Sequence, residues 1–305
     1  MSRSLAAQPG LREALTSLFR ERKDAKAMKR NRRELVAAAD NGQAPIMNRP
    51  LLSIIVPVLN ESALIRAFLE QVRAVAPSAE IIVVDGGSDD GTPELTTGLA
   101  DRGLRVSRGR ASQMNAGARV ARGEIFWFLH ADSVVPPNAL DEIAKILHKE
   151  SNVGGCFRLR LPGRQWIYRV SDSLGNVGVE VFGFALGDHG IFCRRAAFSR
   201  AGEFPDLPLM EDAEFYRALR KCGSMRQSRV AIVGSPRRYE QLGPYRTTIY
   251  YAVILGLYLL GAKMSTLTSV YRRLTGSSNE GHSTGGSARR ATTPSVAAPA
   301  FKSPV

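Results

Sequence analysis

Three short apolar runs in the first half of the chain each end abruptly in polar residues that could do chemistry. Residues 53–59 precede Asn60 and Glu61, residues 81–84 precede Asp85, Gly86, Gly87 and Ser88, and residues 125–129 precede His130, Ala131 and Asp132. β-Branched runs without alternation are typical of strands buried on both faces of a parallel sheet. Because ligands of open parallel sheets bind beyond the carboxyl ends of the strands, we expect the three tips to line one cleft.

The carboxylates at these tips suit different parts of a nucleotide. Asp85 can accept hydrogen bonds from a ribose or a base, although Asp-Gly-Gly-Ser is also ordinary turn chemistry. Asp132 is a candidate ligand for Mg²⁺ or Mn²⁺, since hard divalent cations prefer oxygen. His130 could be a second ligand, a hydrogen-bond donor to a diphosphate or only a strand-end histidine, and imidazole is a poor match for magnesium.

Two further groups of residues lie outside these tips. Glu211 and Asp212 begin a helix predicted over 210–221, where a carboxylate is either a first-turn acid or a general base. Arg108 and Arg110 precede a helix predicted over 111–122, so they could contact a phosphate or form a solvated basic loop. The residues alone leave both pairs of alternatives open.

The elements that must position these residues follow an α/β pattern. Strands are predicted at 51–59, 81–84, 104–107 and 125–129, and helices at 60–75, 111–122 and 138–148. Strand and helix in alternation predict a mostly parallel mixed sheet with helices on both faces. Pro57 within the first strand indicates either an edge strand or the end of a strand.

After residue 151 the pattern changes. An antiparallel strand is predicted at 154–161, a turn and strand at 187–193, and a last short strand at 230–233. The stretch from Ile249 to Ala262 is the most apolar, but it is shorter than the ~20 residues of a membrane-spanning helix. Its tyrosines suit a membrane-adjacent helix and a buried helix equally well.

The charge of the chain predicts anionic partners. Its 305 residues include 42 Lys and Arg against 28 Asp and Glu, for a formal charge of +14. A phosphorylated substrate or an anionic lipid surface would be attracted, whereas the lack of a reader motif argues against nucleic acid. Much of the charge lies between Arg12 and Arg33, in an extension interpreted as solvated and partly disordered, with a membrane-surface or partner helix as the alternative.

Four motifs, taken in order, resemble family 2 glycosyltransferases with the GT-A fold. They are Ser-Ile-Ile-Val-Pro-Val-Leu-Asn-Glu (53–61), Val-Val-Asp-Gly-Gly-Ser-Asp-Asp-Gly-Thr (83–92), His-Ala-Asp (130–132) and Met-Glu-Asp (210–212). Each motif is weak alone, but their order and spacing argue against a chance match. The segments 109–118, 128–132, 187–195 and 237–239 further resemble the subgroup of arsenosugar-biosynthesis, or radical-SAM/selenodomain-associated, glycosyltransferases.

The resemblance implies a nucleotide-diphospho-sugar donor, a divalent cation (Mg²⁺ or Mn²⁺) at Asp132 and a catalytic base at Asp212. The donor-side residues that it implies are Pro57, Asn60, Glu61, Asp85, Gly87, Ser88, Arg110, Asn115, His130, Ala131 and Asp132. On the acceptor side it implies Gly187, Asp188, His189 and Glu211. The acceptor would be a hydroxyl on a small or lipid-linked molecule, with a membrane surface as a further candidate partner through the stretch from Ile249 to Ala262 or the basic N-terminus.

The sequence departs from the family pattern at several positions. His130 replaces the first Asp of the Asp-x-Asp metal motif, Gly86 replaces the second Asp of Asp-Asp-Gly-Ser, and His189 stands in place of Gln. An arginine common in relatives is missing from 176–180, which leaves the identity of the acceptor open. The sequence also lacks a clear Gln-x-x-Arg-Trp motif of processive synthases, which predicts one sugar per turnover.

We therefore expect three regions: an extension at 1–49, a GT-A domain at 50–274, and a disordered tail at 275–305. The domain would comprise a nucleotide-sugar half at 50–150, an acceptor half at 151–248 and an apolar helix at 249–274. Three scattered cysteines and the lack of an apolar signal segment predict a cytoplasmic protein, with membrane association and an organelle address left open.

The expected activity is inverting, metal-dependent, non-processive glycosyl transfer. One alternative is a non-catalytic relative that binds a sugar nucleotide or acts as a scaffold, which His130 and Gly86 favour but the retention of Asp132 and Asp212 opposes. Another is a basic membrane-surface-binding protein. A nucleotidyltransferase is disfavoured, because the first strand lacks the glycine-rich loop and downstream lysine expected there.

Overall fold

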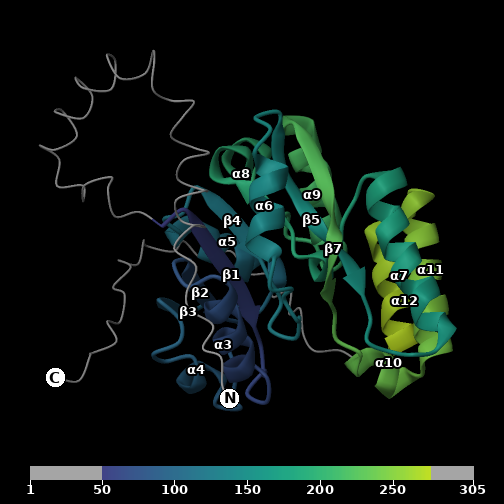
Figure 1. Ribbon diagram of the computed structural model, residues 1–305. Coiled ribbons are helices and arrows are strands. Elements are labelled where there is room, and N and C mark those ends of the chain that lie inside the picture. Colours follow the sequence, from purple (N-terminus) through teal and green to yellow (C-terminus); the bar gives the residue numbers. More distant parts are fainter. Residues whose placement is uncertain (1–49, 276–305) are drawn as a thin grey trace, which may run out of the picture.

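The computed structural model describes residues 50–275, and a seven-stranded mixed sheet organises them (Figure 1). Its strands are β1 (Leu52–Val58), β2 (Glu80–Asp85), β3 (Arg102–Arg105), β4 (Ile125–Phe128), β5 (Asn152–Arg160), β6 (Phe192–Arg194) and β7 (Ser224–Val233). The extension at 1–49 and the tail from residue 276, for which we predicted disorder, lie outside the described residues.

The strand order is β3-β2-β1-β4-β6-β5-β7. Strands β1 to β4 are parallel, β6 runs antiparallel to both of its neighbours, and β7 is parallel to β5. The predicted mostly parallel α/β sheet is therefore confirmed. The third strand was predicted two residues too late, at 104–107 instead of Arg102–Arg105.

Pro57 marks the end of a central strand, so the edge-strand interpretation was wrong. β1 lies between β2 and β4, and its pairing with β4 stops at Ile55, opposite Phe128. Pro57 pairs only with Val84 of β2. Because β4 has already ended at this level, the missing N–H of proline removes no hydrogen bond on that side.

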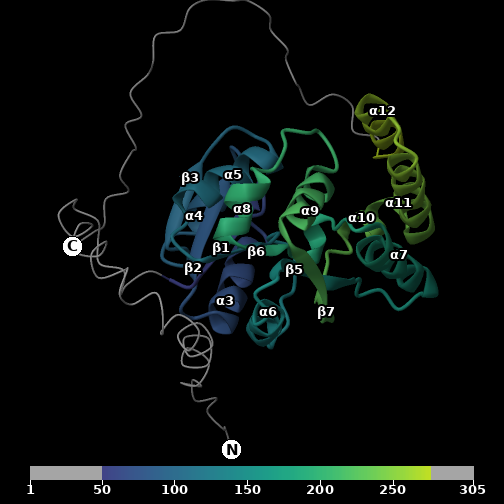
Figure 2. The same ribbon diagram turned by 90° about the horizontal axis from the view of Figure 1, so that it is seen from above.

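Helices cover both faces of the sheet, as Figure 2 shows. The helices are α3 (Ile65–Val75), α4 (Thr92–Leu95), α5 (Arg110–Val120), α6 (Ala139–Leu147), α7 (Trp166–Val177), η2 (Gly178–Phe182), η3 (Gly187–His189), α8 (Arg195–Ala201), α9 (Glu211–Cys222), α10 (Arg237–Leu242), α11 (Pro244–Leu259) and α12 (Met264–Thr275). The first helix begins at Ile65, not at residue 60 as predicted, and the φ of 55° at Asn60 is not helical.

Successive residues of the strands enter two separate cores. Ile54 and Ile81 pack with α3 and α6 on one face, whereas the next residues, Ile55 and Ile82, pack with α5, α8 and α9 on the other. A strand with helices on both sides must be apolar at every position. This explains why the runs in the sequence show no alternation.

Glu80, at the start of β2, is a buried carboxylate with a full set of partners at the amino end of the strand. It is 2% exposed. Ser53 Oγ donates to Oε2 at 2.6 Å, and Arg122 donates its backbone N–H to Oε2 and its Nε–H to Oε1, both at 2.7 Å. Burial raises the pKa of Glu80, but these hydrogen bonds outweigh it and hold that pKa below its usual 4.5.

We expect Glu80→Gln to lower the free energy of unfolding by about 2 kcal/mol at pH 7, because charge-assisted hydrogen bonds are lost. A carboxylate with a depressed pKa stabilises the fold above its unfolded pKa of 4.5, and that contribution is lost as the pH falls through the folded pKa. Urea unfolding of wild type and variant at pH 7 and below pH 4.5 would show the difference shrinking. A constant difference would contradict this role.

Helices α7, α10, α11 and α12 gather beside the β5 and β7 end of the sheet (Figure 1). Ile254 and Tyr258 of α11 are buried with Leu267 of α12, whereas Ile249 and Val253 are exposed. The most apolar stretch is thus buried on one face and open on the other. Within residues 50–275 no helix is long and apolar enough to cross a membrane.

Candidate active site

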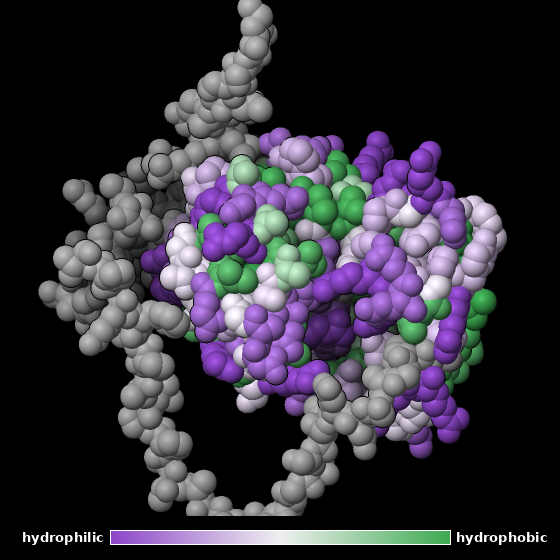
Figure 3. Space-filling view, turned by 90° about the horizontal axis from the view of Figure 1, so that it is seen from below, coloured by the Kyte–Doolittle hydropathy of each residue, from purple (hydrophilic) through white to green (hydrophobic). Residues whose placement is uncertain are grey.

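The carboxyl ends of β1, β2 and β4 lie at the same end of the sheet, because the three strands are parallel neighbours. Figure 3 looks onto this end and shows a hydrophilic hollow there. We predicted a shared cleft because parallel neighbouring strands end on the same side of a sheet, and these three strands do so. The residues of the three tips now have defined contacts.

The tips of β1 and β2 hold each other in place. The backbone N–H of Asn60 donates to Ser88 Oγ at 2.9 Å, and Asn60 Oδ1 accepts the N–H of Asp89 at 3.1 Å. Asp85 is buried, and its carboxylate accepts hydrogen bonds from the backbone N–H groups of Gly87 and Ser88 at 3.0–3.1 Å. Asp85 therefore shapes its own turn at the β2 tip, and its contact with a nucleoside stays a prediction.

Gln113 of α5 joins the ends of β1 and β2 by hydrogen bonds, a role that we did not predict from the sequence. Its Nε2 donates to the carbonyl oxygens of Val58 and Val84, both at 2.8 Å. A Cβ on Gly86 would lie 3.1 Å from this buried amide. The glycine that departs from the family pattern thus leaves room for the glutamine that joins the strands.

Arg237, at the start of α10, connects the β1 and β4 tips. A single guanidinium nitrogen, Nη2, lies 2.9 Å from Glu61 Oε1 and 3.0 Å from Asp132 Oδ2. The hydrogen bonds that Arg237 donates to Glu61 and Asp132 raise the pKa of Arg237, and they outweigh partial burial, which lowers it. We did not predict Arg237 as a site residue, although the Arg-Arg-Tyr motif at 237–239 was a signal in the sequence.

The position of this nitrogen tests whether a divalent cation fits. It shows that one positive centre can contact Glu61 and Asp132 together, and both supply the carboxylate oxygens that Mg²⁺ and Mn²⁺ prefer. Among residues 50–275 no group of three or more metal-binding side chains is present, so the other ligands would be diphosphate or water oxygens. The residues fit such an ion with Asp132 as its main protein ligand.

His130 and Asp212 meet at Gly187. Gly187 N–H donates to Asp212 Oδ2 at 3.0 Å, and a Cβ on Gly187 would lie 2.7 Å from that oxygen and 2.4 Å from His130 Nε2. Within the described part of the chain, Asp212 Oδ1 and His130 Nε2 are buried without a hydrogen-bond partner. The structure thus brings the predicted base beside the β4 tip, with one carboxylate oxygen left for another molecule.

An ion pair between Arg110 and Glu211 joins the start of α5 to the start of α9. Arg110 Nε lies 2.8 Å from Glu211 Oε1, and the carboxylate is almost fully buried. Burial raises the pKa of Glu211 and the charge of Asp212 raises it further, whereas Arg110 lowers it. Arg110, predicted to lie near the nucleotide, therefore contacts the acceptor-side helix α9.

Other predicted residues are placed by packing. Asn115 donates to and accepts from the backbone of Phe204, at 2.9 Å in each case. His189 is fully buried and burial lowers its pKa, which favours the neutral imidazole. Pro57 and Ala131 are buried at their strand tips, whereas Gly87 and Asp188 are open at the cleft.

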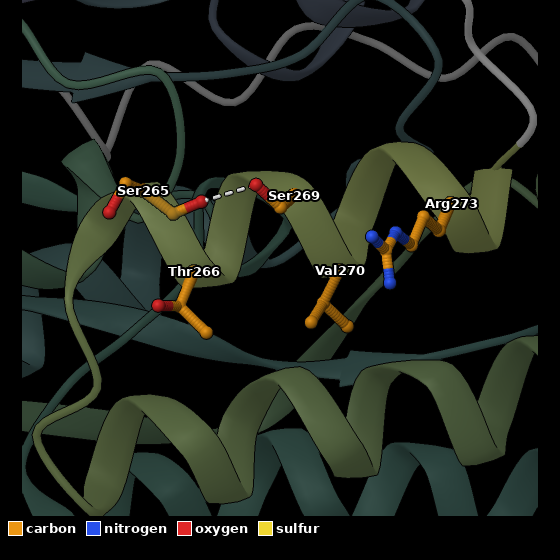
Figure 4. A pocket seen from close by; sticks show the side chains of 5 residues that line it. All are labelled: Ser265, Thr266, Ser269, Val270 and Arg273. Atoms are coloured by element: carbon orange, nitrogen blue, oxygen red, sulfur yellow. Dashed lines mark hydrogen bonds between the residues drawn. The ribbon is translucent and has the colours of Figure 1, made fainter.

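A second hollow runs along α12 (Figure 4). It is lined by Ser265, Thr266, Ser269, Val270 and Arg273. Ser269 Oγ donates back to the carbonyl oxygen of Ser265, as a serine inside a helix often does. This hollow contains none of the carboxylates described above, so the chemistry is expected at the strand tips.

Gly187→Ala is expected to lower kcat about 10²-fold, because small displacements of reacting groups have effects of this size. The φ of Gly187 lies outside the left-handed region, so alanine is tolerated by the backbone, but its Cβ would push Asp212 and His130 apart. Gly256→Ala in α11, where nothing lies within 4 Å of the added Cβ, is the matched control. Equal activity of both variants would argue against the Gly187 contact.

The sheet and its acidic tips define a GT-A nucleotide-diphospho-sugar transferase fold. A solved structure with this fold, a mannosyltransferase from Pyrobaculum calidifontis in complex with GDP-Man and Mn²⁺, aligns with a TM-score of 0.50 and 18% identity, covering 87% of this chain and 81% of the other. Residues 53–201 match the model of glycosyl transferase family 2, so this segment is similar to that family.

Curated relatives are named for transfer to a lipid. An undecaprenyl-phosphate 4-deoxy-4-formamido-L-arabinose transferase from Aeromonas hydrophila is 29% identical over 157 residues, which are 47% of this chain and 48% of the relative. The enzyme of the same name from Serratia proteamaculans is 24% identical over 201 residues, 62% of this chain and 61% of the relative. The chain thus spans about half to three fifths of the length of these relatives.

Proposed function

We propose that the protein transfers one sugar per turnover from a nucleotide-diphospho-sugar to an acceptor hydroxyl, with inversion at the anomeric carbon. The observation that carries this proposal is Asp212, whose buried Oδ1 has no partner among the described residues and lies beside the β4 tip. A family 2 domain supplies the donor side. Asp212 supplies the group that such a transfer needs on the acceptor side.

On the donor side, the joined tips of β1 and β2, with Asn60, Asp85 and Ser88, would hold the nucleoside. Asp132, with Glu61 beside it, would hold a divalent cation, Mg²⁺ or Mn²⁺, which neutralises charge on the leaving diphosphate. The mannosyltransferase of the same fold was solved with GDP-Man and Mn²⁺. Arg237, once it leaves these carboxylates, can reach the same phosphates as a charge-assisted donor.

On the acceptor side, Asp212 Oδ1 accepts the proton of the acceptor hydroxyl as the hydroxyl oxygen bonds to the anomeric carbon. The bond from that carbon to the diphosphate oxygen breaks on the opposite face, and the diphosphate departs with the electron pair. The hydrogen bond from Gly187 to Oδ2 orients the carboxylate so that Oδ1 faces the acceptor.

A phosphate acceptor is the second candidate, because the curated relatives are named for undecaprenyl phosphate. Burial lowers the pKa of Arg110, but the charges of Glu211 and Asp212 outweigh it and raise that pKa. The pKa of Arg238 is also raised, although burial lowers it, with Tyr251 as the main cause. These two arginines on the acceptor side could bind a phosphate. An ionised phosphate oxygen needs no base. The buried Asp212 therefore favours the hydroxyl, and the arsenosugar-type subgroup suggested by 109–118 and 187–195 remains part of the proposal.

A panel of sugar nucleotides, with and without Mn²⁺, tests the donor side by thermal shift. We expect one donor to raise the Tm in the presence of Mn²⁺ and to be hydrolysed slowly without an acceptor. A donor-specific shift without any turnover or hydrolysis would instead indicate the non-catalytic relative. No shift with any sugar nucleotide would contradict the proposal.

A further inference from the structure

The outer surface of α7 and η2 carries large apolar side chains that remain exposed in the described structure. The exposed residues are Trp166, Val170, Val177, Val181 and Phe182, with Trp166 at 64% exposure. Their spacing of four, seven and four residues along 166, 170, 177 and 181 places them on one side of a helix. The stripe therefore has the pattern of a buried face although it is open.

Helix α11 carries a second stripe of the same kind. Tyr245, Ile249 and Val253 are exposed at intervals of four residues, and Leu260, just past the helix end, is 85% exposed. α7 packs against α11, and the rings of Trp166 and Tyr245 make an edge contact with centroids 5.8 Å apart. The two stripes thus adjoin, and we call them the α7–α11 surface; Figure 3 shows hydrophobic residues along the edge on this side.

The fold itself does not require this surface to be apolar. The inner sides of the same helices are already filled, with Ile167 and Tyr168 of α7 packed with Tyr239, and Ile254 of α11 packed with Phe184. Adjoining exposed apolar side chains, as opposed to single scattered ones, usually mark an interaction site. The surface therefore calls for a partner outside the described residues.

The charges around the α7–α11 surface indicate which kind of partner would bind it. Residues 243–275 include no Asp or Glu, and they carry Arg246, Lys263, Arg272 and Arg273. Arg246, Lys263, Arg272 and Arg273 are all exposed. On the α7 side the exposed acid Glu180 is paired with Arg158. An apolar stripe with Trp and Tyr, bordered by an excess of bases over acids, is the pattern of a helix that lies in the interface of an anionic membrane.

We propose that the α7–α11 surface docks on an anionic lipid bilayer, with both helices lying in the plane of the interface. The Tyr239 ring of α10 is tilted against Tyr168 of α7 and Tyr251 of α11, with centroids 5.3 and 6.0 Å apart. Two residues earlier in α10, Arg237 contacts Glu61 and Asp132 at the cleft. Docking through α7 and α11 therefore places the cleft beside the lipid headgroups. This inference goes beyond the proposed activity and does not depend on which sugar is moved.

Tryptophan fluorescence of the full chain tests the docking directly. The chain has two tryptophans, Trp127 and Trp166, and Trp127 is fully buried in the sheet. With phosphatidylglycerol vesicles we expect the emission to move to shorter wavelength and acrylamide quenching to fall several-fold. Trp166→Phe should still co-sediment with the vesicles but show no such shift, which assigns the signal to this residue.

The double variant Ile249→Glu/Val253→Glu should bind the same vesicles at least about tenfold more weakly, because two apolar side chains no longer enter the interface. Val134→Glu, an equally exposed valine outside the surface, is the matched control and should bind like wild type. Vesicle binding with Trp166 still open to acrylamide would overturn the proposal in favour of another basic region. A dimer in solution that the double variant abolishes would overturn it in favour of a second copy.

Discussion

Replacing Asp212 with asparagine is expected to lower kcat about 10³-fold while changing the affinity for the sugar nucleotide less than about twofold. The amide keeps the size of the side chain and can still accept the N–H of Gly187, but it cannot take the proton of a hydroxyl. Steady-state kinetics with a hydroxyl acceptor and calorimetry with the donor would separate the two effects. Asp206→Asn, an exposed acid in the loop before α9, is the control for the same chemical change.

The size of the decrease in kcat for Asp212→Asn also distinguishes a hydroxyl acceptor from a phosphate acceptor. A phosphate acceptor is already ionised at neutral pH, so Asp212→Asn would then lower kcat far less, and a steep loss would require a hydroxyl. Undiminished turnover with a hydroxyl acceptor would remove Asp212 from the role of base. In that event the unpartnered Oδ1 would have to serve binding instead.

Asp132→Asn is expected to abolish the Mn²⁺-dependent part of donor binding and to lower kcat/KM by roughly 10²–10³-fold, the equivalent of several kcal/mol of charge stabilisation. The neutral amide is a weaker ligand for a hard cation than the carboxylate. It also brings no negative charge to the place where Arg237 Nη2 now lies and where the cation would bind. Calorimetry of the sugar nucleotide with and without Mn²⁺ measures the first effect without any turnover.

Two further variants isolate the cause of that loss. Asp141→Asn on α6 removes an exposed acid outside the cleft and should leave the Mn²⁺ dependence unchanged. Arg237→Gln should raise the affinity of the donor-free protein for Mn²⁺, because the guanidinium no longer competes for Glu61 and Asp132. If Asp132→Asn keeps the full Mn²⁺ response, the ion is held elsewhere.

The strands could be predicted because their physical cause is local. A strand covered by helices on both faces must be apolar throughout, and the runs around Ile54, Ile81 and Phe126 show this directly. β3 is an edge strand with residues alternately half-buried and exposed, so its run is weak and was placed two residues late. Pro57 could not be assigned to the strand end without knowing where β4 stops.

The site residues were predicted from family motifs, because the residue types alone left alternatives open. Asp132 follows β4 and Asp212 lies in the first turn of α9, and their contacts with Arg237 and Gly187 leave the predicted roles as predictions. Gln113 and Arg237 act on partners that lie 29 to 176 residues away in the sequence. The Arg-Arg-Tyr motif marked Arg237, but no local pattern indicates which residues either side chain contacts. Asn115 was predicted from a motif, but its amide is engaged by Phe204, 89 residues away.

The position of β7 restricts how this protein could be recombined with its relatives. The segment that matches the family ends at residue 201, yet β7 pairs with β5 along nearly its whole length and Asp212 follows that segment. A chimera that exchanges only residues 53–201 would join a foreign β5 to the native β7 and a foreign β4 tip to the native Asp212. Exchanges that keep β4, β5, β7 and α9 from one parent are therefore the ones expected to retain both folding and specificity.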